Sequence, residues 1–319
     1  MNPHLRRVAL IYNPASGQYS ARRPAAVQEA LAVLREGGVE VEAYETGAPG
    51  SGAAYAQECI RQDCGAILAC GGDGTVHEIV QVLVGTGVAL GVIPLGTANA
   101  LASDLGLIAP AADVARKLLQ SSTARVPVGR IHYRDAQGNP GSRYFVVAAG
   151  VGADALLMSR LDAGLKRRLG YILYMIEAFR IWATHPFPLF EALTTNGTGD
   201  PHVVEVSQLL AVRVRSFGGV LRRLAPGATL HNGHLHLLAF RTRSRLRYLS
   251  FLLAVIAGRH TFNGDIELLE ASQVECRTRN GSRATLYAEA DGEVLGSLPV
   301  KLEVVPDALN LLIPPGAEP

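Results

Sequence analysis

The segment Cys70–Thr75 joins two stretches of different pattern and limits the folds that this chain can adopt. The apolar run Ala66–Ala69 before it predicts a short buried strand, and Val76–Leu83 after it has the spacing of an amphipathic helix. Glycines at this junction leave main-chain N–H groups open at the start of the helix, which favours phosphate binding. A plain glycine turn between strand and helix is the simpler alternative.

Asp73 lies in the middle of this junction, where its charge would repel a phosphate in direct contact. A carboxylate there is better suited to hold a Mg²⁺ ion, or water on that ion, which bridges to phosphate oxygens. We therefore predict that Asp73 binds a metal ion and that its neighbours bind phosphate through their backbone. These neighbours are Gly71, Gly72, Gly74 and Thr75.

Two further segments repeat the order of strand, loop and helix. The apolar run Val8–Tyr12 precedes the turn Asn13–Gly17, and Ala89–Ile93 precedes the loop Pro94–Asn99. Because ligands of open α/β sheets bind outside the carboxyl ends of the strands, we expect the three loops to share one rim. Hydroxyl and amide side chains suited to a polyanion or a ribose recur in them: Asn13, Ser16, Thr75, Thr97 and Asn99.

The motifs Asn13–Gly17, Gly71–Thr75 and Pro94–Asn99 resemble the catalytic-domain signatures of the diacylglycerol kinase family of lipid kinases. That family includes bacterial enzymes and the sphingosine and ceramide kinases. The resemblance spans nearly the whole chain, since it continues in family order through four more segments: Gly150–Asp154, Leu169–Tyr171, Ala225–Pro226 and Ala290–Glu293. NAD kinases and phosphofructokinases carry a similar glycine motif, so Gly71–Thr75 alone does not separate them.

This resemblance implies an ATP-dependent, Mg²⁺-dependent kinase that phosphorylates a lipid hydroxyl, with diacylglycerol converted to phosphatidic acid in phospholipid biosynthesis as the leading reaction. It also implies which residues contact the nucleotide. Besides Gly71–Thr75 these are Asn13, Pro14, Ser16, Gly17, Thr46, Thr97 and Asn99.

The chain is long enough for two domains, with 319 residues of which 48% are hydrophobic and 18% charged. Its pattern changes near Ser121–Pro127, from strands alternating with helices to alternating apolar and polar runs. We predict an N-terminal Rossmann-like three-layer α/β nucleotide-binding domain over 1–125. A C-terminal antiparallel β-sandwich-like domain for the lipid would cover 126–305, with the active site in the cleft. The resemblance suggests that 306–319 return to the first domain.

The expected strands of the second half are separated by turns such as Asn232-Gly233 and Asn280-Gly281. Helices are expected at about 155–183 and 246–257. The strands are Val126–Tyr133, Ser142–Ala149, Glu205–Val214, His234–Phe240, Gln273–Arg279, Ala284–Ala290, Val300–Val305 and Ala308–Ile313.

Asp291-Gly292-Glu293 places two carboxylates around a glycine at a tight bend. If both project toward one opening, their mutual repulsion would help one of them to take a proton from an attacking hydroxyl. An exposed hairpin turn is the simpler interpretation of Asp-Gly. The resemblance favours the catalytic one, since lipid kinases of this family carry an acidic pair here. Either residue could be the base, and we favour Glu293.

The sequence departs from the family pattern at two places. Ala100 stands where the family has an acid after the asparagine of Pro94–Asn99, and His231-Asn232-Gly233 replaces a pair of acids before glycine. Bacterial members hold a structural magnesium at the second place. Asn232 could offer its amide oxygen, with the carbonyls of Thr229 and His234, but a neutral ligand binds this hard cation less well. We expect that site to be weak or lost.

Basic residues outnumber acidic ones over 126–300, with arginines grouped at 213–215, 222–223 and 241–247 and Lys166–Arg168. They predict either a solvated basic face or peripheral contact with an anionic lipid surface. The arginines lack interleaved aromatic residues, so nucleic acid is not expected as a partner. A homodimer is one assembly left open.

No apolar run reaches membrane-spanning length, the N-terminus lacks a signal-peptide pattern, and the four cysteines lack metal-ligand spacing. We therefore expect a cytoplasmic protein that associates peripherally with membranes. Two alternatives to the lipid kinase stay open: a soluble-substrate kinase of the NAD kinase type, and a catalytically weak nucleotide- or lipid-binding regulator of the same fold.

Overall fold

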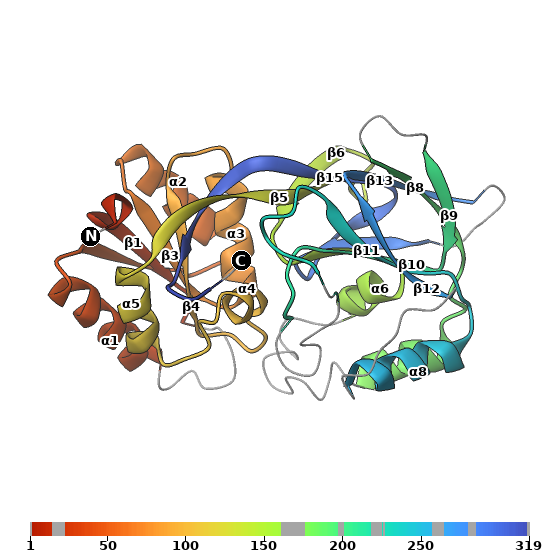
Figure 1. The fold of residues 1–319 in the computed structure, drawn as a ribbon, viewed down its shortest axis with the longest axis horizontal. Helices are drawn as coiled ribbons and strands as arrows, with labels where there is room; N and C mark the ends of the chain where they lie inside the picture. Colours follow the sequence, from red (N-terminus) through yellow and green to blue (C-terminus); the bar gives the residue numbers. More distant parts are fainter. Residues whose placement is uncertain are drawn as a thin grey trace. The chain divides into compact units, whose positions relative to one another are not determined.

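The computed structural model describes residues 2–14, 23–160, 176–196, 201–217, 225, 227–256, 265–279 and 285–317. The chain forms two compact units, each described here by itself (Figure 1). Unit 1 contains Met1–Val128, Ser216–Gly219 and Pro306–Pro319. Unit 2 contains Gly129–Arg215 and Val220–Val305.

Unit 1 is built on a parallel sheet with the strand order β2-β1-β3-β4, extended beside β4 by the end of β15. Strands β3 and β4 are buried over nearly their whole length, as expected for a parallel sheet with both faces covered. The strands are β1 (Arg7–Tyr12), β2 (Glu40–Glu45), β3 (Ala66–Gly71), β4 (Ala89–Pro94) and β15 (Glu293–Ile313).

Helices cover this sheet, with α1 packed against α5 and α2 packed against α3 (Figure 1). They are η1 (Pro3–Leu5), α1 (Arg23–Glu36), α2 (Ser51–Arg61), α3 (Asp73–Leu83), α4 (Ala100–Asp104) and α5 (Ala111–Leu119). The alternation of strands and helices along the chain therefore predicted this α/β unit correctly.

Unit 2 is mainly antiparallel. One path of neighbouring strands runs β12-β11-β10-β7-β14-β15. From β15 a second path continues through β13 and β8 to β9. Strand β15 also pairs with β5, and β5 pairs with β6. The strands are β5 (Ser122–Arg134), β6 (Pro140–Phe145), β7 (Ala148–Val151), β8 (Phe190–Thr195), β9 (His202–Val206), β10 (Gln208–Val212), β11 (Leu235–Phe240), β12 (Ile266–Ala271), β13 (Gln273–Thr278) and β14 (Tyr287–Ala290). The described helices are α6 (Ala153–Arg160), residues 176–184 and α8 (Arg245–Ile256).

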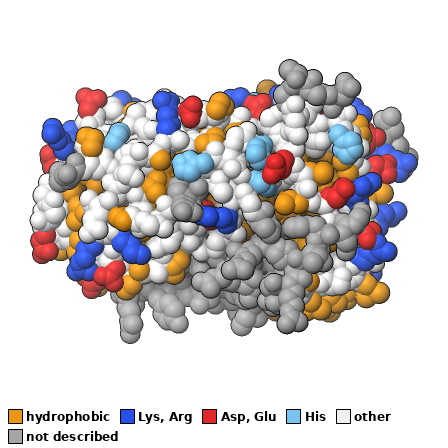
Figure 2. All heavy atoms as spheres, viewed as in Figure 1, with side chains coloured by type: hydrophobic (Ala, Val, Ile, Leu, Met, Phe, Trp, Pro, Cys, Tyr) orange, Lys and Arg blue, Asp and Glu red, His pale blue; other side chains and the backbone are white. Residues whose placement is uncertain are grey.

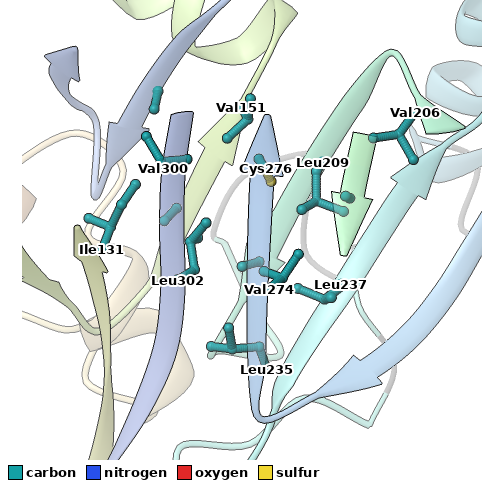
Figure 3. Close-up of a cluster of buried hydrophobic side chains, with 14 of the residues drawn as sticks. Ile131, Val151, Val206, Leu209, Leu235, Leu237, Val274, Cys276, Val300 and Leu302 are labelled. Carbon is teal, nitrogen blue, oxygen red and sulfur yellow. The ribbon is translucent and has the colours of Figure 1, made fainter. Parts of the chain in front are cut away.

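The core of unit 2 collects alternate side chains from several of these strands (Figure 3). Leu235 and Leu237 on β11 and Val274 and Cys276 on β13 each stand two residues apart, so each pair points to one face of its strand. The period-two pattern of the second half therefore marks the buried faces, and the predicted β-sandwich-like architecture is confirmed.

Several strand limits differ from the expectation. The strand expected at Val126–Tyr133 is β5, which begins earlier, at Ser122, and ends at Arg134. The separate strands expected at 300–305 and 308–313 belong to the single strand β15. Conversely, 142–149 and 205–214 each form two strands, broken at Val146–Val147 and at Ser207. Strands β8 and β12 were not predicted, because glutamates and threonines interrupt their short apolar runs.

All four cysteines are free thiols in buried positions, as their lack of paired spacing predicted. Burial raises the pKa of Cys70 to about 12, so this thiol beside the glycine junction stays protonated and unreactive. Among the described residues, no helix is both long and apolar enough to cross a membrane.

Candidate functional site

The loops that follow β1, β2, β3 and β4 are joined by main-chain hydrogen bonds at the carboxyl ends of these strands. Asn13 N donates to the carbonyl of Cys70 at 3.3 Å, Thr46 N to Tyr12 at 2.9 Å, and Leu95 N to Gly71 at 2.8 Å. The predicted rim therefore exists within unit 1. It contains Asn13, Thr46 and the glycine junction, whereas Ser16 and Gly17 lie outside the described residues.

Two glycines allow the loops after β3 and β4 to touch. A Cβ on Gly96 would lie 2.5 Å from the Cα of Gly72, a distance that backbone atoms do not tolerate. Gly72 is also the residue that precedes α3, so its backbone and the first N–H groups of the helix face the rim without a side chain in between. Such open N–H groups at the start of a helix suit a phosphate.

Asp73 opens α3 and joins it to the next loop. Its Oδ2 accepts a hydrogen bond from Asn99 N at 2.9 Å, and its Oδ1 accepts one from Ala100 N at 2.7 Å. The carboxylate thus satisfies the first N–H groups of α4. A carboxylate oxygen can accept a hydrogen bond and also bind a metal ion, so these two contacts are compatible with the metal role predicted for Asp73.

Three polar side chains near the rim, two from the loop after β4 and Thr75 from α3, have different surroundings. Asn99, which has a positive φ of 50°, closes its own loop: Oδ1 accepts from Gly96 N at 3.0 Å, and Nδ2 donates to the Gly96 carbonyl at 2.9 Å. Thr97 is exposed on the rim. Thr75 is buried against Gly71. Asn99 and Thr75 therefore shape the rim, and Thr97 is the side chain of the three that faces solvent.

Two residues near the rim have structural roles that the sequence pattern did not reveal. Glu78 accepts hydrogen bonds from Gly50 N at 3.0 Å and Gly52 N at 3.1 Å, so it holds the start of α2 instead of its own helix. Arg23 is buried and donates from Nη1 to the carbonyl of Pro14 at 3.2 Å. Burial lowers the pKa of Arg23. An arginine on a helix is usually expected to face solvent, and nothing in the neighbouring sequence indicates that Arg23 is buried.

In unit 2, Asp291 and Gly292 form a two-residue hairpin turn between β14 and β15, with φ values of 47° and 86°. The Asp291 carboxylate accepts three main-chain hydrogen bonds, from Val146 N at 3.0 Å, Val147 N at 2.9 Å and Ala148 N at 3.0 Å. It therefore anchors the segment before β7. The expectation that both acids project into one opening does not describe Asp291.

Glu293 is the exposed first residue of β15, on the far side of the same turn. A third acid supports this turn: the buried Glu289 accepts a hydrogen bond from Gly292 N at 2.7 Å through Oε2. Of the acidic pair, Glu293 thus has the solvent access that a proton acceptor for a substrate needs, and Asp291 fixes the position of the turn.

The structural magnesium site implied at Asn232 does not fit the residues present. Arg213 is 0% exposed, and its Nη1 donates to the carbonyls of Asn232 at 2.7 Å and His234 at 2.8 Å. Its Nη2 donates to the carbonyl of Leu230 at 2.9 Å. The Asn232 amide oxygen accepts from Thr229 Oγ1 at 3.0 Å. Of the expected metal ligands, the guanidinium therefore takes the His234 carbonyl and Thr229 takes the Asn232 amide oxygen. Arg213 is neither solvated nor available to a lipid.

Asp154, at the start of α6, is a half-buried acid whose two carboxylate oxygens are sealed from solvent and lack hydrogen-bond partners among the described residues. Burial raises its pKa to about 6. The approach is close, because a Cβ on Gly150 would lie 1.7 Å from Asp154 Oδ2. This close contact explains why residue 150 is a glycine.

Comparison with known proteins places both halves of the chain. The family model of the diacylglycerol kinase catalytic domain matches residues 7–131. The model of the YegS C-terminal NAD kinase beta sandwich-like domain matches residues 146–313. A diacylglycerol kinase of Mycobacterium tuberculosis is 29% identical over 315 residues, which covers 97% of this chain and 95% of the relative.

Two further similarities agree with these matches. A probable lipid kinase YegS-like protein of Chromohalobacter salexigens is 30% identical over 91% of this chain and 89% of its own length. A solved diacylglycerol kinase structure from Bacillus anthracis str. Sterne has a TM-score of 0.71 at 18% identity and covers 98% of each chain, which shows a shared fold. Both matched domains occur here in the order that the motifs predicted, and the chain belongs to the diacylglycerol kinase and YegS family of lipid kinases.

Proposed function

We propose that this protein transfers the γ-phosphate of ATP to the hydroxyl of a membrane lipid, with diacylglycerol as acceptor and phosphatidic acid as product. The observation that carries the proposal is the rim of unit 1. There, two glycines let the loops after β3 and β4 touch, and Asp73 fixes both loops beside the open start of α3. Phosphoryl transfer depends mainly on such positioning and on charge stabilisation.

In this reaction the N–H groups of Gly72–Gly74 bind the phosphates, whereas that of Thr75 donates to the Gly72 carbonyl. Thr97 contacts the nucleotide from the exposed part of its loop. Asp73 would hold Mg²⁺ directly or through water. When bound, this ion supplies positive charge that stabilises the transferring phosphoryl group. Asp73 also keeps the rim in shape, because its carboxylate fixes Asn99 and Ala100.

We assign proton removal from the lipid hydroxyl to Glu293. As the hydroxyl oxygen bonds to the γ-phosphorus, the bond from that phosphorus to the bridging oxygen of ADP breaks, and the hydroxyl proton passes to the Glu293 carboxylate. Exposure of Glu293 supports this assignment. Asp291 supports it as a positioning residue, since its three main-chain hydrogen bonds tie the turn to the segment before β7.

The test is an assay of the full chain with labelled ATP, Mg²⁺ and detergent-dispersed diacylglycerol, with the product identified by mass. We expect phosphatidic acid, and a loss of roughly 10²–10⁴-fold in turnover for Glu293→Gln. Glu275→Gln, an exposed acid on β13, is the matched control and should keep full activity. Formation of NADP from NAD in place of a lipid product would identify a soluble-substrate kinase. ATP binding without any product would identify a regulator.

A lipid kinase must reach a bilayer, and the helices of unit 2 support a peripheral contact. Phe179 in residues 176–184 and Leu246 in α8 are exposed apolar residues, and Trp182 Nε1 joins the two helices by donating to the Arg245 carbonyl at 2.8 Å. An open pocket of about 480 Å³ lies beside them, lined by His185, Pro186, Arg243, Ser244, Arg245 and Leu246. Apolar and basic side chains together favour an anionic membrane surface.

Sedimentation with vesicles that contain anionic phospholipid tests this contact. The double variant Phe179→Asp with Leu246→Asp should lose vesicle binding and activity on vesicle-borne diacylglycerol, yet keep activity on a short-chain, water-soluble analogue. Val203→Asp, at an exposed apolar residue of β9, is the control and should bind as the unaltered protein does. Equal binding by the double variant would contradict the assignment of this surface.

A further inference from the structure

Two histidines and a glutamate converge at the start of β11 in unit 2. His234 and His236 stand two residues apart on one face of the strand, and Glu270 of β12 lies directly opposite His236 in the antiparallel register. The distance from His234 Nε2 to Glu270 Oε2 is 3.3 Å, and that from His236 Nδ1 to Glu270 Oε1 is 3.5 Å. Figure 2 shows one face of the molecule, on which a histidine side chain lies next to an acidic one.

From this geometry we propose that His234, His236 and Glu270 form a binding site for Zn²⁺ or a similar divalent transition-metal ion. The potential ligand atoms all lie within 4.8 Å of one another. In a tetrahedral zinc site with bonds near 2.0–2.1 Å, ligand atoms are about 3.3 Å apart. The two nitrogen–oxygen pairs here, at 3.3 and 3.5 Å, are close to this separation, and each uses a different oxygen of Glu270. Two imidazoles and a carboxylate form a common three-residue zinc set, which leaves one position for solvent.

His236 is the residue that distinguishes this cluster from an ordinary surface ion pair. Its side chain is only 3% exposed, and its Nδ1, which faces Glu270, is sealed from solvent without a hydrogen-bond partner among the described residues. A buried polar atom in this condition is costly unless a ligand satisfies it.

The surroundings determine how the ring can bind. Asn232 contacts His236 Nε2 through its side-chain amide at 2.5 Å, on the opposite edge of the ring from Glu270. As placed, the Asn232 amide nitrogen donates to Nε2 and the amide oxygen accepts from Thr229 Oγ1. A metal on Nδ1 needs the ring proton on Nε2, and therefore needs the Asn232 amide to turn so that its oxygen faces the ring. The buried charge of Arg213 opposes a second cation nearby. The Glu270 carboxylate is therefore needed to balance the ion.

The site differs from the magnesium site discussed above, because it uses side-chain nitrogens and not the carbonyls that Arg213 already binds. Nitrogen ligands favour zinc-like ions over magnesium. Cross-strand ligation would fasten β11 to the end of β12. The proposal does not depend on the kinase reaction, so its failure and that of the proposed function are separate outcomes.

The experiment is a Zn²⁺ titration of the full chain without a polyhistidine tag, in competition with a chromophoric chelator, and a spectrum of the Co²⁺-loaded protein. We expect one Zn²⁺ per chain and visible bands typical of four- or five-coordinate cobalt. Since even the loss of a partner outside the ligand shell costs 10–100-fold in metal affinity, His234→Ala and Glu270→Gln should each weaken binding by more than about tenfold. Both positions are partly or largely exposed, so these variants should fold.

His231→Ala is the matched control, because His231 is an exposed histidine in the same loop but outside the cluster. It should bind Zn²⁺ as the unaltered protein does, and millimolar Mg²⁺ should not displace the zinc. Unchanged zinc affinity in both His234→Ala and Glu270→Gln would overturn the proposal. Failure of the unaltered protein to take up Zn²⁺ in excess would overturn it as well.

Discussion

At the scale of single residues, acidic side chains in this protein fasten segments that are distant in sequence. Asp73 holds the start of α4, Glu78 holds the start of α2, and Asp291 holds the segment before β7. Each carboxylate accepts main-chain N–H groups that no regular element satisfies, and hydrogen bonds to a charged acceptor are stronger than neutral ones. A carboxylate near the candidate site is thus not by itself a catalytic one.

Asp291→Ala should destabilise the protein by about 3 kcal/mol or more, because it removes the acceptor of three N–H groups in the largely buried segment Val146–Ala148. Thermal or urea unfolding measures this. Glu293→Ala, in the same turn but exposed, should shift stability by about 0.5 kcal/mol or less while abolishing most lipid phosphorylation. Equal loss of stability in the two variants would contradict the division of roles between the two acids.

Glu303 on β15 makes the free energy of unfolding depend on pH. Burial opposes its ionisation, but hydrogen bonds from His132, Arg130 and Lys301 outweigh burial and lower its pKa to about 2. A carboxylate with a lowered pKa stabilises the fold above its usual pKa, and this contribution is lost as the pH falls toward 2. Glu303→Gln should therefore cost up to about 3 kcal/mol at pH 7, and less at pH 4.

Chemical unfolding of Glu303→Gln at pH 7, 5 and 4 tests this expectation. The difference from the unaltered protein should be constant between pH 7 and 5 and should narrow below that. Glu275→Gln is the control, since this exposed acid of β13 should give a small difference at each pH. A Glu303 effect that grows with acidity would have the wrong sign.

At the scale of elements, contacts between loops are as restrictive as the pattern of the elements themselves. The rim needs glycine at two positions because the loops after β3 and β4 meet backbone to backbone at Gly72 and Gly96. The loop before β11 needs a cation for its converging carbonyls, and Arg213 from the end of β10 supplies one.

Gly96→Ala should separate the two loops, because the new Cβ would lie 2.5 Å from the Gly72 Cα. We expect a loss of kinase activity with a moderate fall in stability, of about 1–3 kcal/mol. Gly87→Ala is the matched control, since Gly87 precedes β4 outside the rim and a Cβ there meets no atom within 4 Å. Steady-state kinetics and a melting curve for each variant decide the point. Full activity in Gly96→Ala would refute the need for this close contact.

Arg213→Met should destabilise unit 2 by about 3 kcal/mol or more, because three carbonyls in the loop before β11 lose their donor. Arg213→Lys should recover only part of the loss, since one ammonium cannot reproduce the fixed geometry of a guanidinium. Melting curves with and without millimolar Mg²⁺ measure both effects. The role of Arg213 would be contradicted if Mg²⁺ raised the melting temperature of the unaltered protein and if substitution of Asn232 abolished that rise.

At the scale of the whole molecule, the chain ends contribute to the fold of unit 1. The last part of β15 lies parallel to β4, with Asn310 opposite Ala89 and Leu311 opposite Leu90. Its leucines are buried there, so the C-terminal segment completes a core that the first residues of the chain begin. We therefore expect the folding of unit 1 to depend on the end of β15.

Deletion of residues 306–319 should prevent stable folding of unit 1, because it removes the buried side chains of Leu309, Leu311 and Leu312 together with a strand of the sheet. Limited proteolysis should then cut within 1–128. The shorter deletion of 315–319, which follows the strand, is the control and should leave the protease-resistant pattern unchanged. Resistance of unit 1 in the longer deletion would show that β15 is dispensable.

Local patterns accounted for much of this architecture. The strand-loop-helix order around Gly71–Thr75 predicted β3 and α3, and the same order predicted β1 and β4 with their loops. The alternating runs predicted most strands of unit 2. These predictions succeed because the period of apolar residues depends on the burial of each element's own face.

Sequence alone therefore determined the family, the two kinds of unit and the rim that collects the glycine loops. Only the tertiary structure decided which polar groups are used up inside the fold: Asp291 bonds to a segment 145 residues away, Arg213 fills the predicted metal loop, and Glu270 lies opposite His236. The reason is physical. A hydrophobic period is a property of neighbouring residues, whereas the partner of a charged side chain depends on which distant strands the topology makes adjacent.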